Sequence, residues 1–179
     1  IMMLCAGASE QAVSQWASTL AEADLGVSKT AGDLAGPCLF AVFLGLGRLI
    51  GARFDDGAQL RVMTGASALC VLSYLLIALS PIPALNLAGC ALCGLAVSVS
   101  WPMTLGLAAR AMPQGGMALF ALLAFGGDIG CTIGPGLAGL IAGRCGDDLQ
   151  MGILGAVVFP LLMLAALLSV GGKMKRQAK

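Results

Sequence analysis

The chain has 179 residues, of which 59% are hydrophobic and 11% are charged, and its mean hydropathy is +0.95. Soluble domains carry about a quarter charged residues, so this composition excludes an ordinary soluble protein and points to the lipid bilayer. The formal net charge is +1, without a basic block before the tail, which argues against nucleic-acid binding. Histidine is absent, which removes the commonest metal ligand and general base, so we expect neither enzymatic activity nor a cofactor.

Apolar runs follow one another along the whole chain, and a run of about 20 residues is enough to cross the hydrocarbon core. They cover residues 1–21, 34–54, 62–79, 84–107, 117–142 and 151–170, approximately. Polar breaks containing Asp, Gly and Pro separate the runs. The sequence therefore predicts an all-α membrane protein of six transmembrane helices, with no segment left for a soluble domain.

The basic residues predict the orientation, because positively charged loops stay in the cytoplasm. If the N-terminus is inside, only Lys29 and Arg144 face outward. The other eight are then cytoplasmic: Arg48, Arg53, Arg61, Arg110, Lys173, Lys175, Arg176 and Lys179. Both termini are therefore expected in the cytoplasm, with a bacterial cytoplasmic (inner) membrane as the location. The chain opens inside an apolar run without an initiator Met, so we expect it to be part of a longer protein.

A polar face runs along the first predicted helix. At about 100° per residue, five polar residues share an arc of about 140°. They are Glu10, Gln11, Ser14, Gln15 and Ser18. Such a face should avoid lipid, and Gln11, Ser14 and Gln15 are candidates for hydrogen-bonding a polar solute. Trp16 falls on the opposite side, where it faces lipid or packs against another helix.

Glycines and charged residues mark the second helix and its end. Small residues such as Gly45, Gly47 and Gly51 let helices approach closely in lipid, and Gly130, Gly134 and Gly139 repeat the pattern in the fifth helix. Arg48 and Arg53, with Asp55 and Asp56 nearby, either clamp neighbouring helix ends and gate access or simply anchor the helix at the cytoplasmic surface.

Two further segments carry candidate functional residues. Pro102 is expected to kink the fourth helix beside Trp101, which is a candidate aromatic platform for a solute or an ordinary packing residue. Asp128 lies mid-way along the fifth helix, where an ionised side chain costs at least ~2.5 kcal/mol. A carboxyl in low-dielectric surroundings takes up a proton more readily, so Glu10 and Asp128 are candidates for proton coupling. The alternative is a protonated carboxyl that hydrogen-bonds a neighbouring helix.

The seven cysteines do not predict a disulfide framework, because most lie inside apolar runs. Cys90 and Cys93 have the spacing of a redox pair, but cysteines in such a run are expected to serve as small packing residues.

Several motifs together resemble a known family. They are Gly7-Ala8-Ser9-Glu10 to Trp16, Gly32-Asp33-Leu34-Ala35-Gly36-Pro37, Gly45-Leu46-Gly47-Arg48 and Gly127-Asp128-Ile129-Gly130-Cys131. With the helix count and orientation, the chain resembles the C-terminal six helices of a major facilitator superfamily transporter, in the fucose-permease-like branch. The family's loop motif carries an acid where this chain has Arg48.

The resemblance implies a three-plus-three inverted repeat that forms half of a transporter of about twelve helices. It implies secondary active transport of a small polar solute, sugar-like or another metabolite, by alternating access and proton-coupled as in a symporter or permease. The partners would be the bilayer, the solute, H⁺ and the missing N-terminal six-helix half. A drug or metabolite antiporter of the same superfamily is the first alternative. A self-assembling six-helix channel is the alternative from another class.

Overall fold

The structure is a computed structural model that describes residues 1–25, 28, 30 and 34–177, with all their side chains except those of 23–25, 35 and 173–177. The described part is helical and contains no strand. The expectations for Lys29, Gly32, Asp33 and the basic residues of the C-terminal tail lie outside the described residues or side chains.

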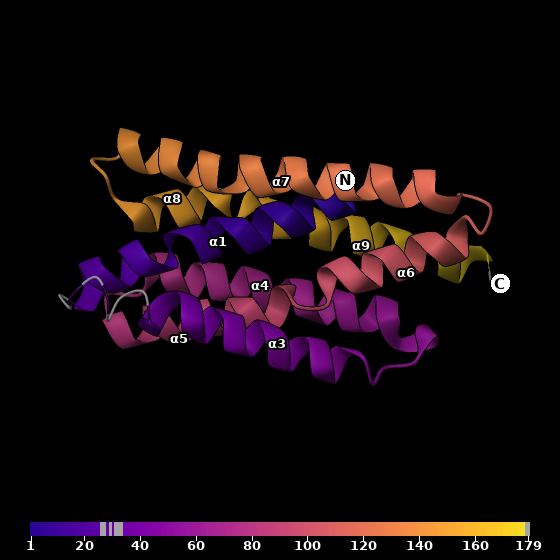
Figure 1. Cartoon of the computed structure of the whole chain (residues 1–179), viewed down its shortest axis with the longest axis horizontal. Coiled ribbons are helices and arrows are strands. Elements are labelled where there is room, and N and C mark those ends of the chain that lie inside the picture. Colours follow the sequence, from indigo (N-terminus) through magenta and orange to yellow (C-terminus); the bar gives the residue numbers. More distant parts are fainter. Residues whose placement is uncertain (26–27, 29, 31–33, 178–179) are drawn as a thin grey trace.

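The helices run along the long axis of the molecule as one bundle (Figure 1). Their bounds are α1 Met2–Leu25, η1 Leu34–Cys38 (a π-helix), α3 Leu39–Gly51, η2 Asp56–Ala58 (a 3₁₀ turn), α4 Gln59–Leu79, α5 Pro83–Val97, α6 Ser100–Ala111, α7 Gly116–Arg144, α8 Leu149–Ala156 and α9 Val158–Gln177. The α3–α4 and α6–α7 connections lie at one end, and the α7–α8 connection lies at the other (Figure 1).

Four helical segments of the described chain are long and apolar enough to cross a membrane: Asp56–Leu79, Pro83–Ala111, Gly116–Arg144 and Leu149–Gly172. A shorter apolar helix covers Gly36–Gly51. Helix α1 is long enough to cross a membrane, but its polar residues make it less apolar than these four segments. The chain thus has the helices of a membrane protein, as its composition predicts.

Two prolines explain why two of the long segments are broken. A proline lacks the N–H that the carbonyl four residues earlier would accept from, and its ring crowds that carbonyl. Pro102 lies four residues after Ser98, and α5 gives way to α6 at residues 98–99. Pro160 lies four residues after Ala156, where α8 ends. The kink expected at Pro102 is therefore present as a helix break.

The centre of the bundle is occupied by α1, which packs most extensively against α7 and also touches α5 and α9. Glycines bring the two backbones together. A Cβ atom on Gly130 would collide with the carbonyl oxygen of Leu4, and one on Gly134 would collide with that of Ala8. The close approach expected for these glycines is confirmed. The same prediction is wrong for Gly45, where an added Cβ atom would meet nothing within 4 Å.

None of the seven cysteines forms a disulfide, and Cys90 and Cys93 are buried in the core. Their neighbours include Phe40, Tyr74 and Ile77, so they pack as small apolar residues. The expectation that no disulfide framework holds the chain is consistent with this arrangement.

The contact between α1 and α7 predicts opposite effects for two glycines of α7. Gly130→Ala should lower the free energy of unfolding by about 1–3 kcal/mol, because the added methyl group must displace backbone. Gly136→Ala meets nothing within 4 Å and should be neutral or stabilising by up to about 1 kcal/mol, since alanine is the better helix former. Thermal unfolding in detergent micelles measures both. Equal effects at the two positions would contradict the close contact.

Candidate functional site

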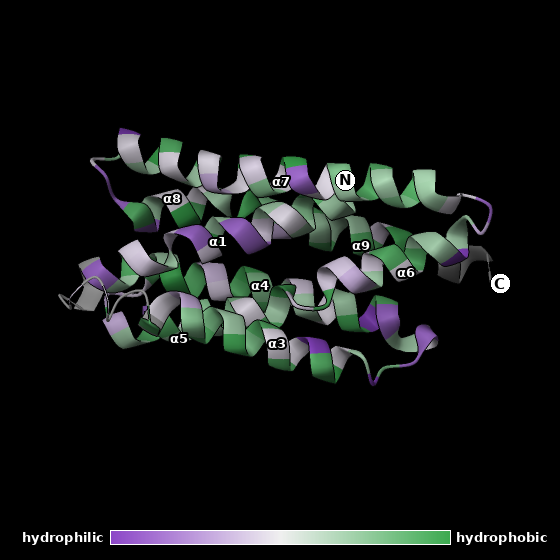
Figure 2. Cartoon of the chain, viewed as in Figure 1, coloured by the Kyte–Doolittle hydropathy of each residue, from purple (hydrophilic) through white to green (hydrophobic). Residues whose placement is uncertain are grey.

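The polar arc of α1 lies outside the core. Glu10, Gln11, Ser14 and Ser18 are half-buried and Gln15 is exposed. The other side of α1 is buried among apolar residues, including Ala8, Ala12, Val13 and Ala17. Figure 2 shows the resulting hydrophilic stretch in the middle of α1, surrounded by helices that are mostly hydrophobic.

Glu10 is the most confined acid of this arc. Its Oε2 atom is shielded from solvent and has no hydrogen-bond partner among the described residues. Three side chains from three other helices lie within electrostatic range of its carboxyl group: Arg48 of α3, Cys93 of α5 and Cys131 of α7. No ion pair closer than 4 Å joins Glu10 to Arg48, since Arg110–Asp56 is the one such pair found among the described side chains. Glu10 therefore lies within electrostatic range of a cation without forming an ion pair with it.

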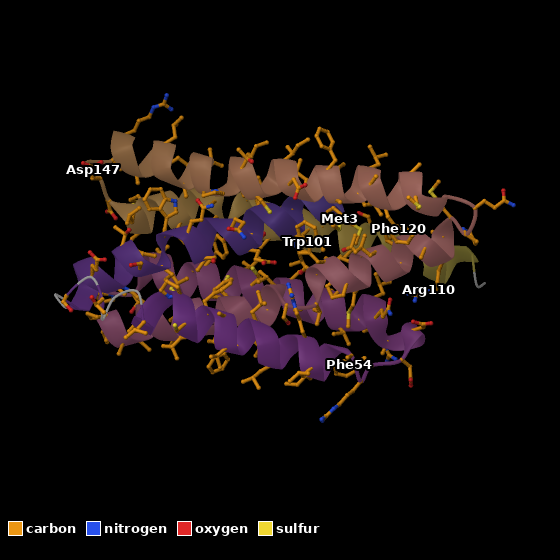
Figure 3. All side chains as sticks on the ribbon, viewed as in Figure 1. Met3, Phe54, Trp101, Arg110, Phe120 and Asp147 are labelled. Carbon is orange, nitrogen blue, oxygen red and sulfur yellow. The ribbon has the colours of Figure 1, made fainter. Side chains whose placement is uncertain are left out.

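Arg48 and Trp101 share the wall of a cavity of about 600 Å³, between α3, α6 and the start of α4. The indole Nε1 of Trp101 is buried and has no hydrogen-bond partner in the described part of the chain. Pro102 and Met103 add apolar wall beside it. Figure 3 places Trp101 near the middle of the long axis, with Arg110 and Asp147 towards opposite ends. The cavity thus combines a cation with an aromatic ring, while the unpartnered Trp101 N–H is shielded from solvent.

Asp128 lies next to this region on α7. The ring of Trp101 packs against Gly127, so closely that a Cβ atom there would collide with it. The Asp128 side chain is exposed, and its backbone carbonyl accepts a 3.1 Å hydrogen bond from Thr132. Asp128 and Glu10 both lie within electrostatic range of Cys131. The hydrogen bond from a protonated Asp128 to a neighbouring helix, which was the structural alternative, is not among the described contacts.

Gln15 lines a separate cavity of about 410 Å³, together with Trp16, Thr132 and Pro135. The Trp16 Nε1 donates a 3.2 Å hydrogen bond to the carbonyl oxygen of Pro135. Of the two roles considered for Trp16, the structure therefore shows packing, between α1 and α7. Two of the residues predicted to bind a solute therefore line different cavities: Gln15 lines this one, and Trp101 lines the cavity shared with Arg48.

The clamp expected from Arg48 or Arg53 with the nearby acids is made by a different arginine. Arg110, at the end of α6, donates to Asp56 Oδ1 at 2.6 Å and also to Gln59 Oε1. Gln59 in turn donates to Asp56 at 3.0 Å. Arg53 is exposed in the connection after α3 and joins no ion pair among the described residues. No local pattern in the sequence pairs Asp56 with Arg110, because they lie on separate helical segments.

Buried hydroxyl groups behind α1 are the feature that sequence patterns did not identify. Tyr74 is fully buried and donates a 2.8 Å hydrogen bond to the carbonyl oxygen of Ser9. The hydroxyls of Ser9 and Ser67 border a cavity of about 10 Å³ between α1 and α4, room for about one water molecule. Small hydroxyl residues in apolar helices carry little periodic signal, so only their packing reveals them.

Comparison with known proteins gives no significant match: no known family, curated protein or solved structure matches this chain.

The hydrogen bond from Tyr74 to Ser9, the residue before Glu10, is expected to stabilise the fold measurably. Tyr74→Phe removes only the hydroxyl group and its hydrogen bond, while the Ser9 carbonyl remains an acceptor within helix α1. We expect the free energy of unfolding to fall by about 0.5–1.5 kcal/mol. Ser169→Ala is the control, because its hydrogen bond to Ala165 is local and exposed and should contribute less than about 0.5 kcal/mol. Thermal unfolding in micelles that shows no difference between the two variants would contradict the role of Tyr74.

Proposed function

We propose that this chain is one half of a secondary active transporter of a small polar solute. In this proposal, α1 and the η1–α3 segment cross the membrane together with the four long apolar segments. The six crossings would match the C-terminal half of a major facilitator superfamily transporter. The proposed three-plus-three inverted repeat and a missing N-terminal half of six helices complete this arrangement. The observations that support the proposal are the apolar bundle and the polar groups inside it.

The carrying observation is the gathering of Glu10, Arg48, Trp101 and Asp128 from four helices around the middle of an apolar bundle. A charged side chain in the membrane interior is costly and usually marks a pathway or a binding site. A static structural role is a poorer account, because neither carboxylate is paired within 4 Å in the described part of the chain.

In this proposal the cavity at Trp101 and the polar arc of α1 face the missing half. Rocking of the two halves would expose the solute to each side in turn. Glu10 and Asp128 would bind and release the coupling proton, and Gln11, Ser14 and Gln15 would hydrogen-bond the solute. Arg53 and the Asp56–Arg110 cluster would lie at the cytoplasmic end, with both termini of the chain on the same side.

The orientation predicts a labelling pattern in whole cells. Cys145 is exposed in the connection after α7, which would face outward. In a variant with the other cysteines replaced by alanine, Cys145 should react with a membrane-impermeant thiol reagent. A single cysteine added after Lys179 should react only after the cells are permeabilised. The reverse pattern would overturn the orientation.

Proton coupling predicts that one carboxyl is needed for accumulation but not for exchange. Asp128→Asn and Glu10→Gln keep the side-chain volume and hydrogen-bonding capacity but cannot titrate. In vesicles containing the full-length protein, the variant at the coupling site should lose accumulation driven by a pH gradient while it retains solute exchange.

Both assays are run on the same vesicles, so loss of protein affects both and loss of coupling affects one. Wild-type accumulation by both variants would refute coupling at these residues. Solute flux through vesicles that contain only the 179-residue chain would favour a self-assembling channel instead.

A further inference from the structure

The cavity at Trp101 places a cation beside an aromatic ring. Arg48 presents a guanidinium group, which can hold a carboxylate with two parallel hydrogen bonds. Trp101 lines the same cavity, while its Nε1 atom is shielded from solvent. The acceptors on the same wall, Asp56 and Gln59, are already hydrogen-bonded to Arg110. What the cavity offers a ligand is therefore the positive charge of Arg48 beside an aromatic and apolar surface.

Few charged side chains determine the net charge of the wall of the Trp101 cavity. Asp56 is neutralised by Arg110 at 2.6 Å, which leaves Arg48 without an acid within 4 Å among the described residues. Glu10 is the acid found within electrostatic range of Arg48. Cys93 and Cys131 from two other helices also lie within electrostatic range of Glu10, and Asp128 lies within range of Cys131. Arg48 is thus the only cation identified near Glu10 in the described part of the chain.

We propose that the solute is a small organic anion whose carboxylate binds Arg48, and that the negative charge of Glu10, within electrostatic range of Arg48, weakens this binding until Glu10 takes up a proton. This inference rests on the proposed function and names its substrate class. Binding of one carboxylate and one proton leaves the net charge of the site unchanged: the anion replaces the negative charge that protonation removes from Glu10. Proton and anion therefore enter together, which is the requirement for symport of a monocarboxylate.

The test uses the fluorescence of Trp101. The chain has two tryptophans, so Trp16→Phe leaves Trp101 as its sole indole. The variant chain in detergent micelles is titrated with benzoate and, separately, with benzamide, which has the same ring without the charge. We expect benzoate to change the fluorescence at far lower concentration than benzamide. Binding of benzoate should be tighter at acidic than at mildly alkaline pH, within the range where benzoate stays ionised.

Substitutions identify the groups responsible. Arg48→Gln should weaken benzoate binding by at least roughly tenfold, the loss expected for a charge-assisted hydrogen bond. Arg48→Lys keeps the positive charge but cannot donate two parallel hydrogen bonds, so it should bind benzoate with intermediate affinity. Such binding would also show that the site of the variant is folded. Arg61→Gln, an exposed arginine outside this cavity, is the matched control and should bind as the parent does. Glu10→Gln should bind benzoate equally well at both pH values.

Several results would overturn the inference. Equal binding of benzoate and benzamide, or unchanged affinity in Arg48→Gln, would exclude Arg48 as the anion site. A pH dependence that persists in Glu10→Gln would exclude Glu10 as the group whose charge controls binding. Gradient-driven transport of a neutral solute without benzoate binding would refute the anion while supporting the transporter. Benzoate binding at Arg48 in a full-length protein that transports no carboxylate would support the site and refute the proposed function.

Discussion

The contact between the backbones of α1 and α7 is the constraint on which the arrangement of the polar groups depends. Lipid provides no hydrophobic force between helices, so association in a membrane relies on close packing and hydrogen bonds. Gly130 and Gly134 supply the packing against Leu4 and Ala8, and Trp16 supplies a hydrogen bond to Pro135. Because Glu10 follows Ala8 by two residues, this contact determines where its carboxyl group lies. The same contact turns the apolar side of α1 into the core and leaves the polar arc outside it.

The break between α5 and α6 supplies the other half of the site. A continuous helix would carry residue 101 along the axis of α5, whereas the break before Pro102 lets α6 begin at Ser100 on its own course (Figure 1). Trp101 then packs on Gly127, which has no side chain to exclude the indole ring. One wall of the cavity is therefore made by a proline acting on its own helix and by a glycine of another. Neither residue has a reactive or charged side chain, yet both determine where the Trp101 ring lies.

Much of the fold could be predicted from the sequence because it depends on local patterns. Apolar runs predicted the helices, and the 3.6-residue period separated the polar arc of α1 from its buried side. Pro102 predicted a kink, which is present as a break between α5 and α6. The site was less predictable. Periodicity gives the face of a helix but not the helix it meets, so the proximity of Arg48 to Glu10 and the pairing of Arg110 with Asp56 had no local signal. Gly45 shows the same limit: its type predicted a close contact, but its face meets nothing. The inverted repeat and the missing half stay predictions.

The position of Arg48 bears on the anchoring role that its sequence context allowed, since the clamp is made by Arg110. An arginine that only anchors a helix extends towards the headgroups and needs no acid or aromatic ring beside it. Arg53 fits that description, because it is exposed beyond the end of α3. Arg48 is exposed as well, but it lies within α3, five residues earlier, and shares a cavity with Trp101. Arg53 already supplies an anchor at this end of α3, so anchoring alone does not account for Arg48. The proposed anion between Arg48 and Trp101 would account for it.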